Sequence, residues 1–400
     1  MDMRPSEPAI LYFGNDWFAE NRTSSHHIAR WLAKRFRVYY IECPGMRAPK
    51  GSGRDLKKIW AKLGRFLRGA RPVEDGLKVR TLLQVPLHRF AVVRRVNRML
   101  IAATLRWLMW RERVHRPISW FLIPHLAPVV GRLGECLSVY YCIDDYAALP
   151  DVDAEAIRAM DEELTRKADL VFVASDTLHP AKLRLNAHTY VSSHGVDVEH
   201  FASARDPLTT VPADLAALPR PCVGFFGLIE RWIDLDLVDF LAAQRPQWTF
   251  ALIGRVALSP EEVPRRPNLH YFGKRPYETL PAYGKGFDAA IIPYRLTQQV
   301  LHANPIKLRE YLAMGKPVVS VGTPEIDKYA DVVEIAHSPE EFLSRLDAVL
   351  ERPAAPAETR RRIDRVTGES WDMRLGSMLE TVAGHLAAKQ PAQPVMNCVS

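Results

Sequence analysis

Short apolar runs alternate with longer, helix-like segments along most of the chain. In the first half, the runs that predict strands cover residues 9–14, 37–42, 119–123, 139–143, 170–174 and 189–192. In the second half they cover residues 222–227, 249–254, 269–272, 289–293 and 318–321. Strands that alternate with helices favour parallel sheets. The pattern therefore predicts an α/β fold with two successive doubly wound sheets.

A stretch rich in proline and alanine, residues 207–221, separates the two series. A chain of 400 residues, 48% of them hydrophobic, is long enough to bury two cores of ordinary size. We therefore expect residues 1–200 and 201–370 to form two Rossmann-like domains. Ligands of such folds bind at a cleft beside the sheets, so we expect the cleft between the domains to hold the site.

The segment around residues 306–314 predicts the most informative helix of the chain. Asn304 and Pro305 precede it and suit an N-cap and a first-turn position. Gly315 follows it and suits a left-handed C-cap. These signals predict a short helix between a polar loop and the strand at residues 318–321.

Lys307 and Glu310 give the start of this helix a specific chemistry. They are three residues apart, so they project from the same helix face. A cation beside the free N–H groups of a helix start suits a diphosphate. A carboxylate one turn later can accept two hydrogen bonds from a ribose diol. The segment therefore predicts a nucleotide site, for which Arg231 and Lys274 are further candidate phosphate partners.

Basic residues are concentrated in one part of the first half. Between Arg47 and Arg116 there are 19 lysines and arginines against four acids, although the whole chain has a net charge of only +8. In segments 56–71 and 94–116 these charges are interleaved with apolar and aromatic residues at helical spacing. Such a pattern is typical of a helix on an anionic membrane, which we favour for 56–71. For 94–116, packing of one face on the domain core is an equal alternative.

The remaining composition narrows the setting. The amino-terminal residues lack the apolar core of a secretory signal, and no apolar run reaches the roughly 18 residues of a membrane span. Five cysteines show neither metal-binding spacing nor an even disulfide framework. No nucleic-acid-binding module accompanies the basic stretch, so nucleic acid is not expected as a partner. We expect a cytoplasmic protein.

Several motifs follow the order found in glycosyltransferases of the two-domain GT-B fold. EYLAMGKPVV, residues 310–319, resembles the second half of their nucleotide-sugar signature, E-x7-E followed by A-x-G-x-P-V-V. HGVD at 194–197 resembles the junction that ends their first domain, and FGL at 226–228 resembles the opening of their second. The resemblance implies the GT-B fold and a nucleotide-sugar donor. It also implies that residues 371–390 form a helix that returns to the first domain.

The first acid of the signature is missing, because His302 occupies its position. Retaining enzymes of this type place that acid near the donor sugar, so its loss favours inversion of configuration. VYYCID, residues 139–144, resembles the Val-Tyr-x-x-x-Asp segment of the inverting xanthan-pathway glucuronosyltransferase. That resemblance implies that Asp144 is the catalytic base. The chain is also similar to glycosyltransferases of the teichuronic-acid type.

Position along the chain also makes Asp144 a candidate. It follows a predicted strand, at the carboxyl end where α/β sheets bind ligands, and could take a proton from an acceptor hydroxyl. Alternatively, it caps the next helix or is an ordinary loop acid, and Asp145 is then the second choice. Asp16, in the loop after the first strand, is a rival candidate for the base.

The loop after the first strand, residues 14–27, is rich in functional side chains. Trp17 could stack on a sugar ring, and Asn15, Arg22 and His26 could bind an acceptor. Alternatively, the loop is structural and Trp17 is buried in it. On the donor side, the resemblance and the position of the nucleotide helix add the candidates Gly227, Tyr294, Asn304 and Ile306 to Lys307, Glu310 and Arg231.

Metal-binding patterns are weak in this sequence. Asp234-Leu-Asp236 resembles a metal-binding D-x-D motif, but it stands at a predicted helix start, where acids counter the helix dipole. The histidines show no paired-ligand spacing. We therefore expect no metal and no cofactor other than the nucleotide-sugar donor, for which a UDP-sugar is favoured.

Together these observations predict a glycosyltransferase of bacterial exopolysaccharide or cell-envelope synthesis. It would act on a lipid-linked or polymeric saccharide acceptor, and its basic first domain would hold it on the inner face of the cell membrane. One alternative is a soluble glycosyltransferase that acts on a small metabolite. Another is a catalytically degenerate GT-B protein that serves as a scaffold in a polysaccharide synthesis complex.

Overall fold

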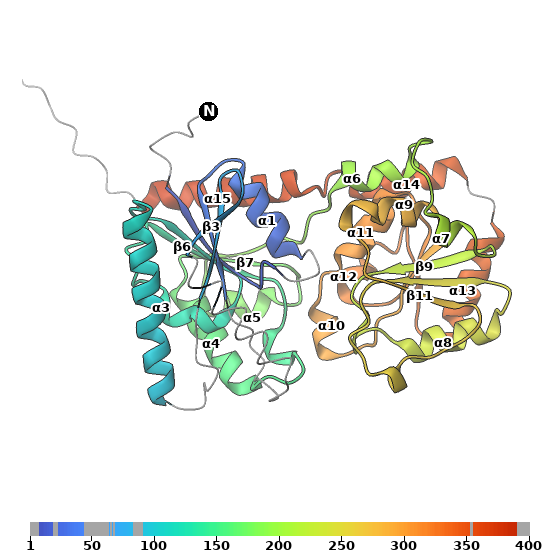
Figure 1. Ribbon diagram of the computed structural model, residues 1–400, viewed down its shortest axis with the longest axis horizontal. Helices are drawn as coiled ribbons and strands as arrows, with labels where there is room; N and C mark the ends of the chain where they lie inside the picture. The colour runs from blue at the N-terminus through green and yellow to red at the C-terminus, as the bar shows by residue number, and fades with distance from the viewer. Residues whose placement is uncertain are drawn as a thin grey trace, which may run out of the picture.

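The computed structural model describes residues 8–18, 23–43, 64, 66, 69–82, 91–352 and 355–389. Two α/β domains lie side by side, each built on its own sheet (Figure 1). Most apolar side chains of the predicted strands are buried between these sheets and the helices that cover them. The predicted α/β class with two doubly wound sheets is confirmed.

The first sheet has eight strands in the described part of the chain, in the order β3-β4-β2-β1-β5-β6-β7-β8. All neighbours are parallel except β3 and β4, which form an antiparallel hairpin at one edge. The central strands are buried along their whole length, as expected of strands covered on both faces. The bounds are β1 Ile10–Gly14, β2 Val38–Glu42, β3 Arg71–Glu74, β4 Leu77–Thr81, β5 Ile118–Phe121, β6 Leu137–Cys142, β7 Leu170–Val173 and β8 Thr189–Val191.

Helices cover both faces of the first sheet and create two cores. One core lies under α3 and α4, and the other lies under α1 and the last helix of the chain. The helices of this domain are α1 Ser24–Ala33, α3 Ala91–Arg111, α4 Ala154–Lys167 and α5 His179–Leu183, with the 3-10 turns η1 Pro124–Val129 and η2 Tyr146–Ala148.

The second sheet has six parallel strands in the order β11-β10-β9-β12-β13-β14. Its strands are β9 Cys222–Phe226, β10 Thr249–Ile253, β11 Leu269–Gly273, β12 Ala289–Ile292, β13 Val318–Val321 and β14 Glu334–Ala336. Its helices are α6 Val198–Ala202, α7 Ala213–Ala216, α8 Leu235–Gln244, α9 Leu280–Lys285, α10 Gln298–His302, α11 Ile306–Ala313, α12 Pro324–Asp327, α13 Pro339–Glu351 and α14 Pro356–Thr367.

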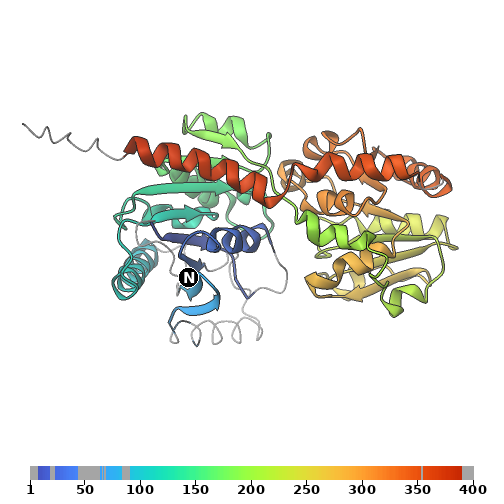
Figure 2. The same cartoon turned by 90° about the horizontal axis from the view of Figure 1, so that it is seen from above.

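The last helix, α15 (Trp371–Lys389), leaves the second domain and lies along the first (Figure 2). It packs against α1, where Trp31 Nε1 donates to Asp372 Oδ1 at 2.5 Å. The outgoing and returning chains touch where they cross, because Val196 and Ser370 form a parallel bridge. Gly195 is required there, since a Cβ at this position would lie 2.7 Å from the Trp371 backbone.

The chain pattern left some elements unpredicted. The hairpin β3–β4 and the edge strand β14 were missed, because edge strands carry short or alternating apolar patterns that resemble loops. The first sheet ends at Val191 and the second begins at Cys222, with the short helices α6 and α7 between them. The predicted membrane segment 56–71 lies largely outside the described residues.

Candidate functional site

A cavity of about 690 Å³ lies between the two domains. Its walls include Ile143 and Asp144, which follow β6, and Gly227, which follows β9. It therefore opens at the carboxyl ends of both parallel sheets, where ligands of α/β folds bind. Residues that the sequence separates by more than 100 positions meet there.

Lys307 lies over the backbone of Gly227 at the floor of the cavity. A Cβ at Gly227 would approach Lys307 Cε to 2.0 Å, so a larger residue would displace the lysine side chain from this position. The backbone of Gly227 also has φ +145°, a conformation that favours glycine. Gly254, which follows the neighbouring strand β10, also lies in close contact, because a Cβ at this position would meet the Gly227 carbonyl oxygen at 1.8 Å. These glycines allow α11 to bring its first turn close to the strand ends.

Glu310 lies one turn after Lys307 and also lines the cavity. Burial raises its pKa from 4.5 to about 7, and the nearby Lys307 charge only partly opposes this. Within the described residues its carboxylate accepts no hydrogen bond. A buried acceptor without a partner is unfavourable unless a ligand supplies the donor. Glu310 is therefore suited to receive hydroxyl groups from a bound molecule.

Asp144 faces the same cavity from the first domain. Its Oδ2 accepts a hydrogen bond from Gln299 Nε2 at 3.3 Å, whereas Oδ1 is buried and has no partner within the described residues. Burial raises the pKa of this carboxyl from 3.8 to about 6, although the hydrogen bond from Gln299 lowers it. Asp144 does not cap a helix. Asp145 caps η2 instead, and Asp153 caps α4.

The loop after β1 is more structural than the sequence suggested. Trp17 is buried, 8% exposed, and packs against the rings of His26 and Tyr40. His26 Nδ1 accepts from the Thr23 amide at 3.1 Å, and Nε2 lies 3.1 Å from the Trp17 carbonyl. Both ring nitrogens of His26 are thus engaged in holding the loop. Trp17 and His26 still line the cavity with their remaining surface.

Three other predicted residues of this loop lie away from the cavity wall or outside the described part. Asp16 Oδ1 accepts from the Phe18 amide at 3.0 Å, and the Asn15 carbonyl accepts from the Tyr40 hydroxyl at 2.9 Å. Neither residue is among those that line the cavity. Arg22 lies outside the described residues. The geometry therefore favours Asp144 over Asp16 as the acid that a ligand meets.

Asn304 lines the cavity, but its side chain is committed elsewhere. Its Nδ2 donates to Glu325 at 2.5 Å, and its Oδ1 accepts from Arg309 at 2.8 Å. The predicted N-cap role is wrong, because Pro305 is the N-cap of α11 and no side chain caps this helix. A buried ion pair between Arg309 and Glu369 extends the same network, with 2.6 Å between Nε and Oε2. The predicted C-cap is right, since Gly315 follows α11 with φ +77°.

The remaining donor-side candidates divide into two groups. Tyr294, Ile306 and Lys274 line the cavity together with Lys307. Arg231 is exposed and lies outside the cavity wall. Sequence reasoning missed His27, Arg30, Trp232 and Gln299, which also contribute to the wall. Only their position in the fold identifies them, because none belongs to a recognisable motif.

Several acids that resemble metal ligands have other partners. Asp234 caps α8 by accepting from the Leu237 amide at 3.2 Å, and Arg295 lies 2.8 Å from Asp236 Oδ2. No group of three or more metal-ligating side chains is found in the described part of the chain. Asp234 thus lies at the start of a helix and caps it, as the sequence predicts.

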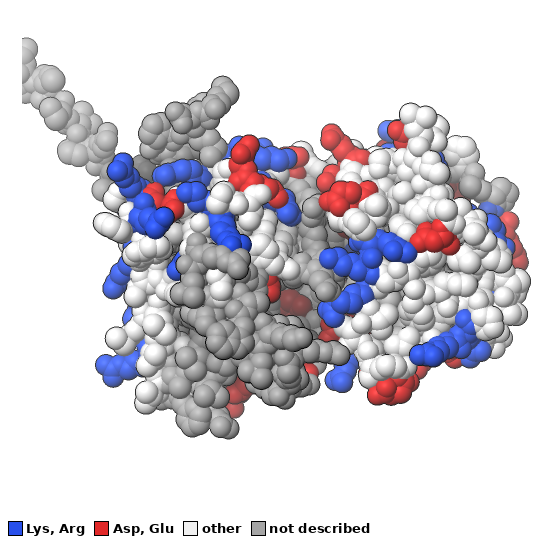
Figure 3. Space-filling view, viewed as in Figure 1, with Lys and Arg blue, Asp and Glu red and all other residues white. Residues whose placement is uncertain are grey.

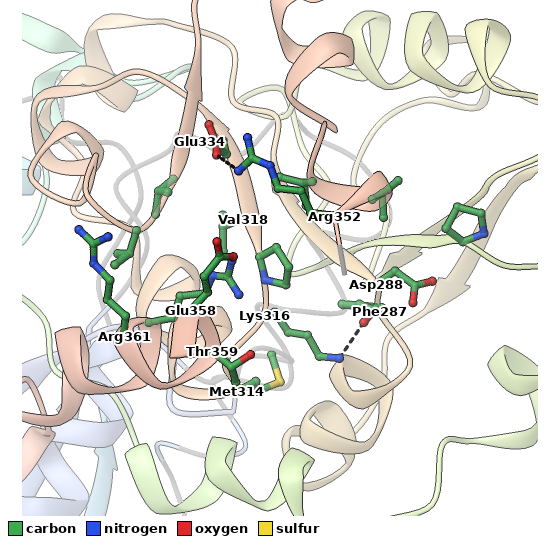
Figure 4. A pocket seen from close by; sticks show the side chains of 18 of the residues that line it. Phe287, Asp288, Met314, Lys316, Val318, Glu334, Arg352, Glu358, Thr359 and Arg361 are labelled. Atoms are coloured by element: carbon green, nitrogen blue, oxygen red, sulfur yellow. Dashed lines mark hydrogen bonds and ion pairs between the residues drawn. The ribbon is translucent and has the colours of Figure 1, made fainter. Parts of the chain in front are cut away.

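A second cavity, of about 800 Å³, lies at the opposite end of the second sheet. Arg352 pairs with Glu334 at its edge, and Lys316 Nζ donates to the Phe287 carbonyl at 2.7 Å (Figure 4). Its lining residues precede strands β12 and β13 and therefore face the amino ends of the sheet. Parallel sheets bind ligands at their carboxyl ends, so the cavity between the domains is the candidate site.

Comparison with known proteins agrees with this geometry. No protein-family model matches the chain. The curated protein named "Putative teichuronic acid biosynthesis glycosyltransferase TuaH", from Bacillus subtilis, is 27% identical over 371 residues, which cover 86% of this chain and 87% of the relative.

Solved structures show the same fold at low sequence identity. Sucrose-phosphate synthase from Thermosynechococcus elongatus superimposes with a TM-score of 0.67 and 14% identity over 96% of this chain and 100% of its own. HepE from Anabaena, solved in complex with UDP and glucose, gives a TM-score of 0.66 and 14% identity over 94% and 100%. The chain has the GT-B fold, and the resemblance found in its motifs is confirmed.

The pKa of Glu310 makes the stability of the protein depend on pH. The pKa of Glu310 is about 7 in the folded protein, whereas it is 4.5 without the burial that the fold imposes. Ionisation of Glu310 therefore destabilises the folded state as the pH rises between these two values. We expect Glu310→Gln to raise the free energy of unfolding by about 2 kcal/mol more at pH 8.5 than at pH 5.5, measured by urea denaturation. The exposed Glu380→Gln serves as control, and equal effects of Glu310→Gln at both pH values would contradict the assignment.

Proposed function

We propose that this chain, which has the GT-B fold, transfers a sugar from a UDP-sugar to a saccharide acceptor with inversion of configuration and without a metal. The observation that carries the proposal is the arrangement across the cleft. Lys307 and Glu310 face it from the second domain, and Asp144 faces it from the first with one buried oxygen unpartnered.

Donor binding is assigned to the second domain. The diphosphate would lie over the first turn of α11, where Lys307 and the free N–H groups supply positive charge. Glu310 would accept hydrogen bonds from the ribose hydroxyls. HepE, a structural neighbour, was solved with UDP and glucose, which supports a uridine nucleotide as the donor carrier.

Transfer would proceed as a single displacement. The acceptor hydroxyl oxygen bonds to the anomeric carbon, its proton passes to the Asp144 carboxylate, and the bond from that carbon to the diphosphate breaks. Lys307 and the start of α11 stabilise the charge left on the UDP. With a pKa of about 6, Asp144 is largely ionised at neutral pH and can act as the base.

The acceptor side is proposed to be a membrane-linked or polymeric saccharide of the bacterial cell envelope. The relationship to a protein named for teichuronic acid biosynthesis supports an acidic envelope polymer as the context. No helix in the described part of the chain is long and apolar enough to cross a membrane. We propose that surface contacts attach the protein to the inner face of the membrane.

Helix α3 offers such a contact surface. Its buried face carries Ile101, Leu105 and Leu108, whereas Met99 is 67% exposed and Trp110 is 78% exposed. The exposed apolar residues are Val92, Val96, Met99, Leu100, Trp107 and Trp110. Basic and uncharged surface alternate along the edge that α3 forms, on the side of the first domain away from the second (Figures 1 and 3). Apolar side chains beside arginines suit the headgroup region of an anionic bilayer.

Loss of the Lys307 charge should weaken UDP binding. We expect Lys307→Ala to raise the dissociation constant of UDP about 10- to 100-fold, because a hydrogen bond to a charged group is lost. Isothermal titration calorimetry measures the change, and Lys285→Ala, at the other end of the same domain, is the matched control. If wild-type protein binds no UDP, or both variants bind equally, the scaffold alternative is favoured.

Removal of the proposed base should separate catalysis from binding. Asp144→Asn should reduce UDP release from UDP-sugars by about 100- to 10,000-fold and leave UDP affinity within about twofold. The wild-type rate should fall with decreasing pH through about 6, since the base is then protonated. A panel of UDP-hexoses and UDP-uronic acids supplies the donors. An NMR spectrum that shows a product of unchanged anomeric configuration would refute the role of Asp144.

Charge on the exposed face of α3 should release the protein from membranes. Met99→Glu combined with Trp110→Glu should lower partitioning onto vesicles that contain phosphatidylglycerol by at least about tenfold, because burial of both side chains in lipid is lost. Sedimentation with the vesicles measures the partitioning. Leu208→Glu, at an 88% exposed apolar residue of the second domain, is the control. Unchanged sedimentation of the double variant favours a soluble enzyme.

A further inference from the structure

Gln299 connects the two domains at Asp144. It belongs to α10 of the second domain, and its Nε2 donates to Asp144 Oδ2 at 3.3 Å. Asp144 Oδ1 is buried and has no partner within the described residues, although Asp144 lines the cleft. The carboxylate is therefore held from the second domain through one oxygen, while its other oxygen is buried without a hydrogen-bond partner among the described residues.

Other contacts fix α10 against the first domain near this hydrogen bond. Ser175 Oγ donates to the His302 carbonyl at 2.8 Å, and His302 Nε2 lies 3.9 Å from Asp145 Oδ2. Thr297 caps α10 by accepting from the Val300 amide at 3.3 Å. The His302 end of this short helix is thus held against the first domain and the Thr297 end is capped within the helix, so the amide of Gln299 lies beside Asp144.

We propose that Gln299 is a positioning residue for the base, which fixes the orientation of the Asp144 carboxylate at the cleft so that it can take the proton of the acceptor hydroxyl. This inference rests on the proposed role of Asp144. Gln299 is neutral and donates its hydrogen bond, so it stabilises the ionised carboxylate without neutralising it. Because Gln299 comes from the donor-binding domain, the base is held in this way only while the two domains are in contact.

The electrostatic setting of Asp144 is consistent with this role. Burial raises the pKa of Asp144 to about 6, the hydrogen bonds from Gln299 and from the Asp145 backbone lower it, and the Asp145 charge raises it. The other titratable groups on the elements packed around Asp144 are Cys142, Asp145, Tyr146 and His302. The shared cavity wall adds His26, His27, Arg30, His194, Lys274, Arg275, Tyr277, Glu278, Tyr294, Lys307 and Glu310. Of the described side chains, Gln299 is the one that donates a hydrogen bond to this carboxylate.

A direct titration of Asp144 tests the inference without a substrate. The aspartate carboxyl carbons of the full-length protein are labelled with ¹³C, and the Asp144 signal is assigned by its loss in Asp144→Asn. We expect the midpoint in Gln299→Met to rise by about one pH unit above that of wild type, because a hydrogen bond to the charged form is lost. Methionine fills a similar volume, so a role in packing alone predicts no change.

Gln298→Ala is the matched control, since Gln298 is exposed on the same helix and contacts His302 rather than Asp144. Its midpoint should equal that of wild type. In Gln299→Met, the fall in the rate of UDP release from UDP-sugars at acidic pH should move to higher pH by the same amount. An unchanged midpoint in Gln299→Met overturns the inference, even if Asp144→Asn is inactive. Full activity of Asp144→Asn would instead overturn the proposed base.

Discussion

The buried ion pair between Arg309 and Glu369 is the interaction on which the site depends. Arg309 projects from α11, and Glu369 lies just before the chain crosses back to the first domain. Arg309 also donates to Asn304, whose amide reaches Glu325, and Glu325 accepts from the Asp176 amide of the first domain at 2.9 Å. One continuous network thus joins the nucleotide helix, the loop before it, the crossover and the facing domain. Removing the Glu369 carboxylate would leave the buried Arg309 charge without its ion-pair partner, which costs about 3–5 kcal/mol.

Much of the architecture follows from local pattern, and much of the site does not. The strand runs, the helix of Lys307 and Glu310 and its terminal glycine are signals carried by neighbouring residues, so the sequence sufficed for them. The predicted N-cap role of Asn304 was wrong because the residues that engage its side chain, above all Glu325, lie too far away in the sequence to be recognised from the local pattern. Gln299 could not have been found, since its partner is 155 positions away and the hydrogen bond exists only after both domains have folded.

The cleft is built at the expense of stability in the absence of ligand. Asp144 and Glu310 are both buried acids whose pKa values are raised, to about 6 and about 7, and neither carboxylate has its hydrogen-bonding capacity filled by the described chain. Lys307 lies nearby, against the backbone of Gly227, where a Cβ would displace its side chain. A ligand that donates to the acids and accepts from the lysine would stabilise the folded state in proportion to its affinity. The same buried groups would therefore strengthen ligand binding and lower the stability of the ligand-free protein.

The crossing of the chain at Gly195 and Trp371 has a mechanical consequence. The two connections between the domains touch at one point, where Val196 bridges Ser370. The two connections alone would let the domains rotate about this point but not slide apart, and the contacts of Asp176 with Glu325 and of Ser175 with His302 oppose the rotation. Any rotation about this point would act on α10 through the distance between them, and would separate Gln299 from Asp144. Opening for nucleotide exchange and release of the carboxylate would be one movement.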